Sequence, residues 1–249
     1  MQFPSILFKR QAIGLSDTGV VRNTNQDSYY LDSQKRFFIV ADGMGGYVGG
    51  KEASEISIKA ISNYLEQNWN SSLPSNALIH ESIVIANKEI LKAQDLNPEL
   101  SQMGTTVVVI LFREDGSWRG HVGDSRLYRL RAGQLEKITE DHTWIANYVR
   151  RGELSDEQLR SHPWRHVLLQ CLGRSDLELI EVEPLDTFSG DLLLLCSDGL
   201  TEEVNDQKIS QVLADQNLVD CHAKAATLVE TAKQAGGSDN ITVLLVEEL

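Results

Sequence analysis

Four aspartates stand against apolar stretches in widely separated parts of this chain. Asp42, Asp124, Asp198 and Asp239 occur in the strings FFIVADGMGG, GHVGDSRLYR, LLLLCSDGLT and GGSDNITVLLV. Because each apolar run predicts a buried strand, we expect each carboxylate to emerge at the edge of the core. Several carboxylates gathered at such a place need positive charge to neutralise them. Hard divalent cations bind through oxygen ligands, so the pattern predicts a centre of several Mg²⁺ or Mn²⁺ ions.

The same short sequences have a simpler interpretation. Asp-Gly and Ser-Asp-Asn are common in turns, because Asp, Asn and Gly favour turn conformations. That explanation suffices for any one of the four aspartates taken alone. The recurrence of one context at all four favours the metal centre.

Length and charge limit the classes of function. With 249 residues, 41% of them hydrophobic and 24% charged, the chain can form one large domain or two small ones. The sequence contains no linker or repeat, so we expect a single domain over residues 1–249 and a monomer. The net charge of −13 argues against binding to nucleic acid, which needs a basic stripe, and against docking on anionic membranes.

The cysteines and the N-terminus indicate the compartment. Cys171, Cys196 and Cys221 are odd in number and widely spaced, so neither a disulfide scaffold nor a zinc site is expected. The opening MQFPSILFKRQAIG lacks the pattern of a secretory leader, and no apolar run approaches the roughly 18 residues of a membrane span. We therefore expect a cytoplasmic protein that does not enter membranes.

Hydrophobic periodicity predicts helices kept apart from antiparallel strands. Helical spacing of apolar residues predicts helices over residues 50–67, 75–94, 206–215 and 219–234. Strands are predicted over residues 12–16, 37–41, 105–112, 117–122, 126–131, 134–138, 177–184, 191–196 and 241–247. Turns at Asp115-Gly116 and Ala132-Gly133 predict consecutive hairpins, which excludes a doubly wound parallel sheet. The expected fold class is an α+β layered sandwich.

Six short motifs, in this order, resemble those of the metal-dependent protein phosphatases of the PPM/PP2C family. They are RNxNQD (22–27), ADGMGG (41–46), MGTT (103–106), GDSR (123–126), SDGL (197–200) and GGxDNxT (236–242). The resemblance covers residues 14–246. It implies a four-layer α-β-β-α sandwich, in which helix pairs flank two antiparallel sheets. It also implies a protein serine/threonine phosphatase of bacterial signalling.

The resemblance assigns roles at the metal centre. It makes Asp42 the bridge between two Mg²⁺ or Mn²⁺ ions, with the backbone carbonyl of Gly43 on one ion. Asp198 and Asp239 would hold the other ion, and Asp27 would position its bound waters. The implied reaction is hydrolysis of a phosphomonoester by direct attack of a water or hydroxide that bridges the metals, without a phosphoenzyme.

Further residues complete the implied site. Asp124, helped by Asp198, would hold a weaker third metal ion. Arg22 would bind the substrate phosphate, because its guanidinium offers two parallel N–H donors that match phosphate oxygens. Asn240 would support the loop that carries Asp239.

Residues 143–172 correspond to the flap beside the active site in bacterial members. The segment is long, irregular and rich in aromatic and arginine side chains, so we expect it to select substrates, with His162 within reach of them. A structural excursion that packs on the sheet is the alternative, and His142 is expected to be structural. The stretches EDHTWIA (140–146) and HPWRHVLLQCLG (162–173) resemble the compact cyanobacterial phosphatases that act on the nitrogen signalling protein PII.

Other functions stay open at this stage. The same metal site could act on a small phosphomonoester instead of a phosphorylated protein. An inactive relative could serve as a binding module, although Arg22 and the five aspartates argue against it. Dinuclear nucleases share the carboxylates, but an acidic chain offers no path for a polyanionic backbone.

Tyr47 stands where many bacterial members have a histidine, which is a candidate general acid. Tyrosine, with an ordinary pKa of about 10, is a weaker acid, so an alkyl leaving group should suffer more than a phenolate. Tyr47→His should therefore raise turnover of phosphoserine peptides, by up to about 10²–10⁴-fold, and change turnover of p-nitrophenyl phosphate much less. Equal effects on the two substrates, measured side by side, would refute this role.

Overall fold

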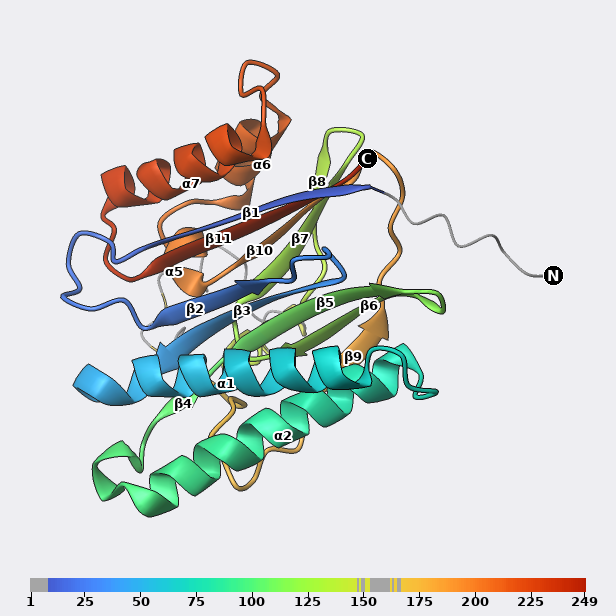
Figure 1. Cartoon of the computed structure of the whole chain (residues 1–249). Coiled ribbons are helices and arrows are strands. Elements are labelled where there is room, and N and C mark those ends of the chain that lie inside the picture. The colour runs from blue at the N-terminus through green and yellow to red at the C-terminus, as the bar shows by residue number, and fades with distance from the viewer. Residues whose placement is uncertain (1–8, 147, 149–150, 153–161, 163, 165–166) are drawn as a thin grey trace.

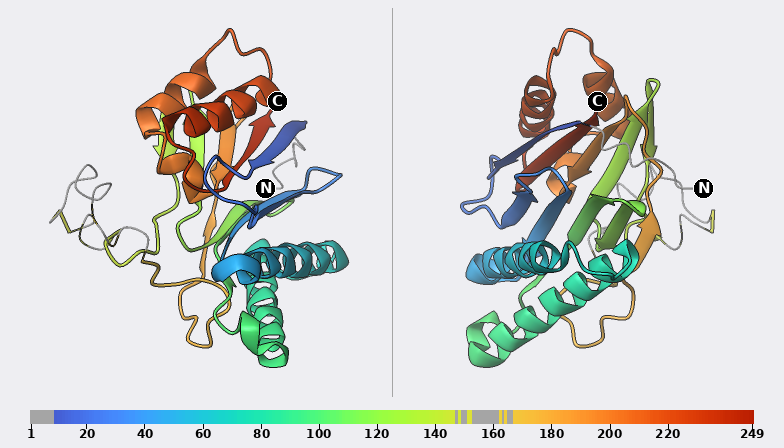
Figure 2. Two further views of the ribbon diagram at one scale, coloured as in Figure 1. Left: turned by 90° about the vertical axis from the view of Figure 1, so that its left-hand side faces the viewer. Right: turned by 45° about the vertical axis from the view of Figure 1, so that its right-hand side comes forward.

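Two antiparallel sheets pack face to face, and helices cover the outer face of each (Figure 1). The computed structural model describes residues 9–146, 148, 151–152, 162, 164 and 167–249. Helices α6 (Asp206–Ala214) and α7 (Cys221–Ala235) lie on one sheet, and α1 (Gly46–Asn68) and α2 (Ser75–Leu96) lie on the other. Figure 2 shows the same four layers from two other sides. The predicted α+β sandwich with four layers is confirmed.

The first sheet joins the two ends of the described chain. Its strand order is β1 (Arg10–Asp17), β11 (Ile241–Glu248), β10 (Leu192–Cys196), β7 (Arg126–Arg131) and β8 (Gln134–Lys137). All of its pairings are antiparallel. The hairpin between β7 and β8 turns at Ala132 and Gly133, both with positive φ, as the sequence predicted.

The second sheet carries the strands in or next to which Asp27, Asp42 and Asp124 lie. Its order is β2 (Asp27–Leu31), β3 (Phe37–Met44), β5 (Val107–Arg113), β6 (Gly116–Val122) and β9 (Glu181–Pro184), and the short β4 (Gly104–Thr105) pairs with β3. These pairings are antiparallel as well. The predicted hairpin at Asp115-Gly116 connects β5 to β6.

Strand β3 shows why the central strands are continuous apolar runs in the sequence. Phe37 and Ile39 pack against α1 and α2, whereas Phe38 and Val40 pack between the two sheets. Successive side chains of a strand point to opposite faces, so a strand covered on both sides is apolar at every position.

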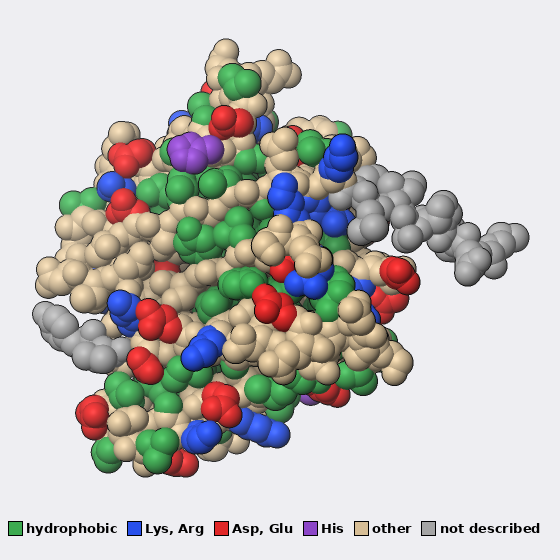
Figure 3. Space-filling view, viewed as in Figure 1, with side chains coloured by type: hydrophobic (Ala, Val, Ile, Leu, Met, Phe, Trp, Pro, Cys, Tyr) green, Lys and Arg blue, Asp and Glu red, His purple; other side chains and the backbone are tan. Residues whose placement is uncertain are grey.

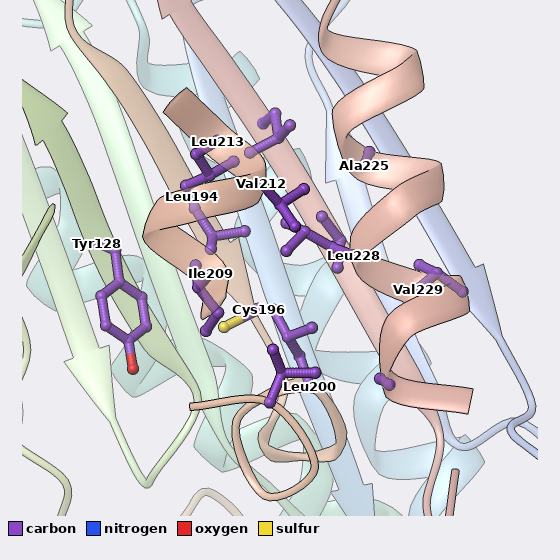
Figure 4. Close-up of a cluster of buried hydrophobic side chains, with 14 of the residues drawn as sticks. Tyr128, Leu194, Cys196, Leu200, Ile209, Val212, Leu213, Ala225, Leu228 and Val229 are labelled. Carbon is purple, nitrogen blue, oxygen red and sulfur yellow. The ribbon is translucent and has the colours of Figure 1, made fainter. Parts of the chain in front are cut away.

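Helices α6 and α7 complete the core on the other side. In Figure 4 the side chains of Ile209 and Val212 from α6 and of Leu228 from α7 gather around Leu194 and Cys196 of β10. The carboxylate of Asp220 caps α7 by accepting the Ala223 N–H at 2.7 Å. The helix ends before Gly236, the stop that the sequence predicted.

Several predicted boundaries are wrong. Helix α1 begins at Gly46 instead of residue 50, and β9 covers only Glu181–Pro184 of the predicted residues 177–184. Strand β3 continues to Met44, so Asp42 lies within the strand and not at its end. Strand β2, the 3₁₀ turn η1 (Pro98–Leu100) and the single turn α5 (Asp198–Thr201) were not predicted. Of the predicted flap, residues 147, 149–150, 153–161, 163 and 165–166 lie outside the described part of the chain.

The face in Figure 3 carries charged side chains of both signs. On the face in Figure 3, acidic and basic side chains are interspersed and not separated by sign. Within the described ranges, no helix has the length and apolar character needed to cross a membrane.

Candidate active site

The four aspartates singled out in the sequence line one cleft. This cleft of about 450 Å³ is lined by residues of α5 and the start of α1, two elements at the left of Figure 1. Asp42 comes from β3, Asp124 from the turn after β6, Asp198 from the start of α5 and Asp239 from the residues before β11. The remaining lining residues are Val21, Arg22, Asn23, Thr24, Gln26, Gly43, Met44, Gly45, Gly46, Thr106 and Leu168.

Asp27 lies directly behind this cleft. It faces Asp42 across the β2–β3 pairing and is buried, with 8% of its surface exposed. The Ser197 hydroxyl donates to Asp27 Oδ2 at 2.7 Å, but Asp27 Oδ1 has no hydrogen-bond partner among the described residues. Asp198 Oδ1 is buried without a described partner in the same way. Two buried carboxylate oxygens thus point to an additional ligand.

The crowded carboxylates hold their protons more tightly than usual. Desolvation raises the pKa of Asp27 to about 6, and desolvation with the charge of Asp239 raises the pKa of Asp198 to about 6. The pKa of Asp42 rises well above its ordinary value through burial and the charge of Asp27. The pKa of Asp124 rises likewise, through burial and the charge of Asp198. At neutral pH the metal-free cleft therefore carries unfavourable negative charge.

Arg22 lies at the edge of the cleft and pairs with Asp239. Its Nη2 donates to Asp239 Oδ2 at 2.7 Å, and 53% of the Arg22 side chain remains exposed. The pair is a partly solvated one, so the guanidinium can rearrange at low cost. It is the kind of group that a phosphate could recruit.

Neutral hydroxyl groups hold the strand of Asp42 in place. The Thr106 hydroxyl accepts the Asp42 N–H at 3.1 Å and lies 2.6 Å from the Ser125 hydroxyl. The Thr105 hydroxyl donates to the Asp42 carbonyl at 2.8 Å. These contacts connect β3 to the turn that carries Asp124 without adding charge to the cleft.

Asn240 fastens the other side of the cleft. Its side-chain amide donates to the carbonyls of Thr18 and Thr24 at 2.9 and 3.0 Å, and its Oδ1 accepts the Gln26 N–H at 2.8 Å. Its own N–H donates to Asp239 Oδ1 at 2.8 Å. The predicted supporting role of Asn240 thus has a geometric basis.

Two glycines let backbone segments meet behind the cleft. A Cβ on Gly43 would lie 1.9 Å from the Gly50 carbonyl oxygen, so β3 and the first turn of α1 touch. A Cβ on Gly199 would lie 2.0 Å from the Asn240 carbonyl oxygen. Only glycine fits at these two contacts, which explains the glycines beside Asp42 and Asp198.

The donor set fits hard divalent cations. The candidate ligands are carboxylate oxygens and a backbone carbonyl, which are the ligands that Mg²⁺ and Mn²⁺ prefer. The buried oxygens of Asp27 and Asp198 and the raised pKa values are the observations that support this fit.

The structure also places residues that the sequence did not single out. The hydroxyls of Thr106, Ser125 and Ser197 lie within the quoted motifs, so the motifs contained a signal for them. Leu168 gave no signal, yet it forms a wall of the cleft. His162 is absent from the described lining of the cleft. Its ring packs against that of Trp164, with the two ring centroids 5.8 Å apart. The side chain of Tyr47 lies outside the described part of the structure.

Comparisons with known proteins agree with this geometry. Residues 20–235 match the family model described as Protein phosphatase 2C. The chain is 36% identical over 236 residues to the serine/threonine protein phosphatase PstP of Mycobacterium tuberculosis (strain CDC 1551 / Oshkosh), covering 93% of this chain but 44% of that protein. The chain thus spans less than half the length of this relative.

Two more matches extend over nearly whole chains. The serine/threonine phosphatase stp of Listeria monocytogenes serotype 4b (strain F2365) is 33% identical over 238 residues, covering 93% of each protein. The solved catalytic domain of PstP, in complex with two manganese ions, has a TM-score of 0.82 at 31% identity. That match covers 96% of this chain and 97% of the solved one.

Removing one charge from the cleft should stabilise the metal-free protein. Folding raises the pKa of Asp198 from its ordinary value of 3.8 to about 6. The folded protein therefore binds this proton more tightly than the unfolded chain, and it loses that stabilisation as the pH rises from about 4 to about 6. Metal-free Asp198→Asn should therefore be more stable than the parent protein by about 1–3 kcal/mol above pH 6, and the difference should shrink toward pH 4. Urea unfolding in EDTA at several pH values measures this difference.

Two comparisons control that experiment. Asp95→Asn replaces an exposed aspartate of α2 and should change the stability little at any pH. Adding Mn²⁺ should stabilise the parent protein more than Asp198→Asn. A constant stability difference between pH 4 and pH 7.5 would contradict the electrostatic account of the cleft.

Proposed function

The chain belongs to the protein phosphatase 2C family, and from this premise we propose that it is a bacterial metal-dependent phosphatase of phosphoserine and phosphothreonine in signalling proteins. The observation that carries the proposal is the meeting of Asp42, Asp124, Asp198 and Asp239 beside Arg22 in one cleft. A phosphomonoester dianion needs compensating positive charge in such a place, and this family supplies it with divalent cations.

We assign two Mg²⁺ or Mn²⁺ ions to Asp42, the Gly43 carbonyl, Asp198 and Asp239, with Asp27 behind them. A weaker third ion is assigned to Asp124 and Asp198. When bound, the ions would neutralise the phosphate and lower the pKa of a water molecule. The unpartnered buried oxygens of Asp27 and Asp198 support the assignment, as do the two manganese ions in the PstP catalytic domain.

Arg22 is the proposed phosphate-binding residue. It is half exposed and lies at the edge of the cleft, so it can turn from Asp239 to a phosphate without unpacking the core. Its planar guanidinium can donate two parallel hydrogen bonds to phosphate oxygens, which a lysine could not reproduce. Asp42, Asp198 and Asp239 are the carboxylates that complete the proposed catalytic set.

The flap is the proposed site of substrate selection. Trp144 contacts Tyr148 and Trp164, each with ring centroids 5.0 Å apart. Trp164 is 54% exposed and lies in the same segment as Leu168, which lines the cleft. An exposed aromatic group on a segment that reaches the cleft through Leu168 suits contact with a protein substrate. We keep His162, which packs on Trp164, as a proposed substrate contact.

The finer proposal is that the substrate is phosphorylated PII. It rests on the resemblance of residues 140–146 and 162–173 to the compact cyanobacterial phosphatases. We further propose a monomer with a single domain over residues 1–249, acting in the cytoplasm. The free thiols of Cys171, Cys196 and Cys221 fit a reducing compartment.

Phosphate release tests the proposed function. A phosphoserine peptide and phosphorylated PII are offered with Mn²⁺, Mg²⁺ or EDTA, beside Asp198→Asn as the inactive control. We expect metal-dependent release that EDTA abolishes and that Asp198→Asn lowers at least about 10²-fold, as expected for losing one strong electrostatic contact. Cleavage of p-nitrophenyl phosphate alone would favour a small phosphomonoester, and Mn²⁺ binding without any release would favour a binding module.

Trp164 tests the proposed role of the flap. Trp164→Ala should raise the KM for a phosphorylated protein about five- to tenfold, the loss typical of an exposed aromatic contact, and leave p-nitrophenyl phosphate turnover unchanged. Phe188→Ala is a matched control, because Phe188 is 56% exposed and does not line the cleft. If both variants behave alike, or if the small substrate suffers equally, the flap does not select substrates through Trp164.

A further inference from the structure

A buried cluster of two histidines and a glutamate lies beside the cleft. His121 faces Glu181 in the pairing of β6 with β9, and His142 follows the turn after β8. His142 Nε2 lies 3.4 Å from Glu181 Oε1, and the centroids of the two imidazole rings are 4.5 Å apart. His121 is fully buried and His142 is 5% exposed. The roles assigned to the cleft use none of these three residues.

His142 holds the residue that precedes Asp124. Its backbone N–H donates to the Gly123 carbonyl at 2.8 Å, and its Nδ1 accepts the Gly123 N–H at 3.2 Å. Both polar groups of Gly123 are therefore bound by the same residue. Two bonds from one neighbour fix the peptide units on both sides of Gly123, and with them the direction in which the chain enters Asp124.

Gly123 is confined on its other side as well. It has a φ of 110°, and a Cβ there would lie 2.6 Å from Thr106 Cγ2. Thr106 is the residue whose hydroxyl accepts the Asp42 N–H. Gly123 thus lies between His142 and Thr106. A shift of His142 would therefore move Gly123 and, with it, the next residue, Asp124.

His142 also holds the base of the flap. Its carbonyl accepts the Leu169 N–H at 2.8 Å, and Thr143 forms an isolated antiparallel bridge with Leu168. Leu168 is the flap residue that lines the cleft. One residue therefore touches the backbone on both sides of the cleft, next to Asp124 and next to Leu168.

The bond from Gly123 determines which nitrogen of His142 carries the proton, and Glu181 Oε1 lies 3.4 Å from the other nitrogen. The imidazoles of His121 and His142 hold the pKa of Glu181 well below its usual range, and Arg119 Nη1 donates to its Oε2 at 3.2 Å. Since Nδ1 of His142 accepts the Gly123 N–H, the proton of a neutral ring must lie on Nε2, facing the ionised Glu181.

The same proton argues against a metal ion in this cluster. Two histidines and a carboxylate at this spacing resemble a transition-metal site. A metal on Nε2 of His142, however, would require the proton on Nδ1, where the Gly123 N–H already points. The cluster is better suited to fixing one tautomer of His142.

We infer that His142 is a positioning residue that keeps Asp124 and the Leu168 wall in register across the cleft. The inference rests on the proposed function only in assigning a divalent cation to Asp124. Replacing residues behind a metal ligand commonly lowers metal affinity by about 10–100-fold, so His142 should influence Mn²⁺ binding without touching the ion.

The test compares two variants of similar shape. Asn at position 142 keeps an acceptor near Nδ1 for the Gly123 N–H, whereas Leu fills similar space without one. Mn²⁺ binding is measured directly, by the EPR signal of free Mn²⁺, in the parent protein, His142→Leu, His142→Asn, Asp124→Asn and Asp124→Asn with His142→Leu. The half-saturating Mn²⁺ for p-nitrophenyl phosphate turnover and the thermal unfolding midpoint are recorded on the same proteins.

We expect His142→Leu to weaken the weakest class of Mn²⁺ sites about tenfold, and His142→Asn to weaken it about threefold or less. In the Asp124→Asn background, His142→Leu should add no further loss, because it acts through Asp124. An equal loss with and without Asp124, equal losses in Leu and Asn variants, or a lower unfolding midpoint with unchanged Mn²⁺ binding would overturn the inference.

A second pair covers a failure of His142→Leu to fold. Glu181→Ala removes the acceptor that faces Nε2 of His142, whereas Glu181→Gln keeps one there, so only the Ala variant should weaken Mn²⁺ binding. Equal behaviour of this pair would also overturn the inference. A parent protein that binds Mn²⁺ as expected but releases no phosphate would refute the proposed function and leave the role of His142 standing.

Discussion

Repulsion among buried carboxylates is the constraint around which this fold is arranged. The two sheets bring Asp42, Asp124, Asp198 and Asp239 to one cleft, with Asp27 behind them. Desolvation and mutual charge raise the pKa values of the buried members, so the folded chain stores unfavourable charge there at neutral pH. The apolar layers between the sheets and under both helix pairs must supply the stability that offsets it.

The frame that holds these carboxylates is polar but neutral. Thr106, Ser197 and Asn240 tie strands and turns together through hydroxyl and amide groups. Charged partners would neutralise the aspartates and compete with a cation for their oxygens, whereas neutral donors fix the backbone and leave oxygens available. Because the supporting groups are neutral and few, one carboxylate oxygen of Asp27 and one of Asp198 have no partner among the described residues.

Local sequence patterns were sufficient to predict the aspartates of the site, but not the contacts between segments that are far apart in the chain. Apolar runs ending near Asp124 and Asp198 were sufficient to predict strands with carboxylates at the core edge, because burial on both faces leaves an unbroken apolar string. Strand β2 was missed because it is a five-residue edge strand between polar segments. Leu168 was missed, and His142 was expected to be structural without its contacts being predicted, for another reason: these contacts involve segments far away in the chain, and neither residue type signals them by itself.

The charge balance of the cleft links the binding of ions to the binding of phosphate. Among the described residues that line it, Arg22 is the one cationic side chain, set against four aspartates, and it already pairs with Asp239. A phosphate dianion entering such a cleft without cations would meet a net negative field. Each cation that binds must therefore improve the affinity for phosphate, and by reciprocity phosphate must tighten the cations. In the function proposed above, Arg22 turns from Asp239 toward the substrate, and the two binding events would meet at this residue.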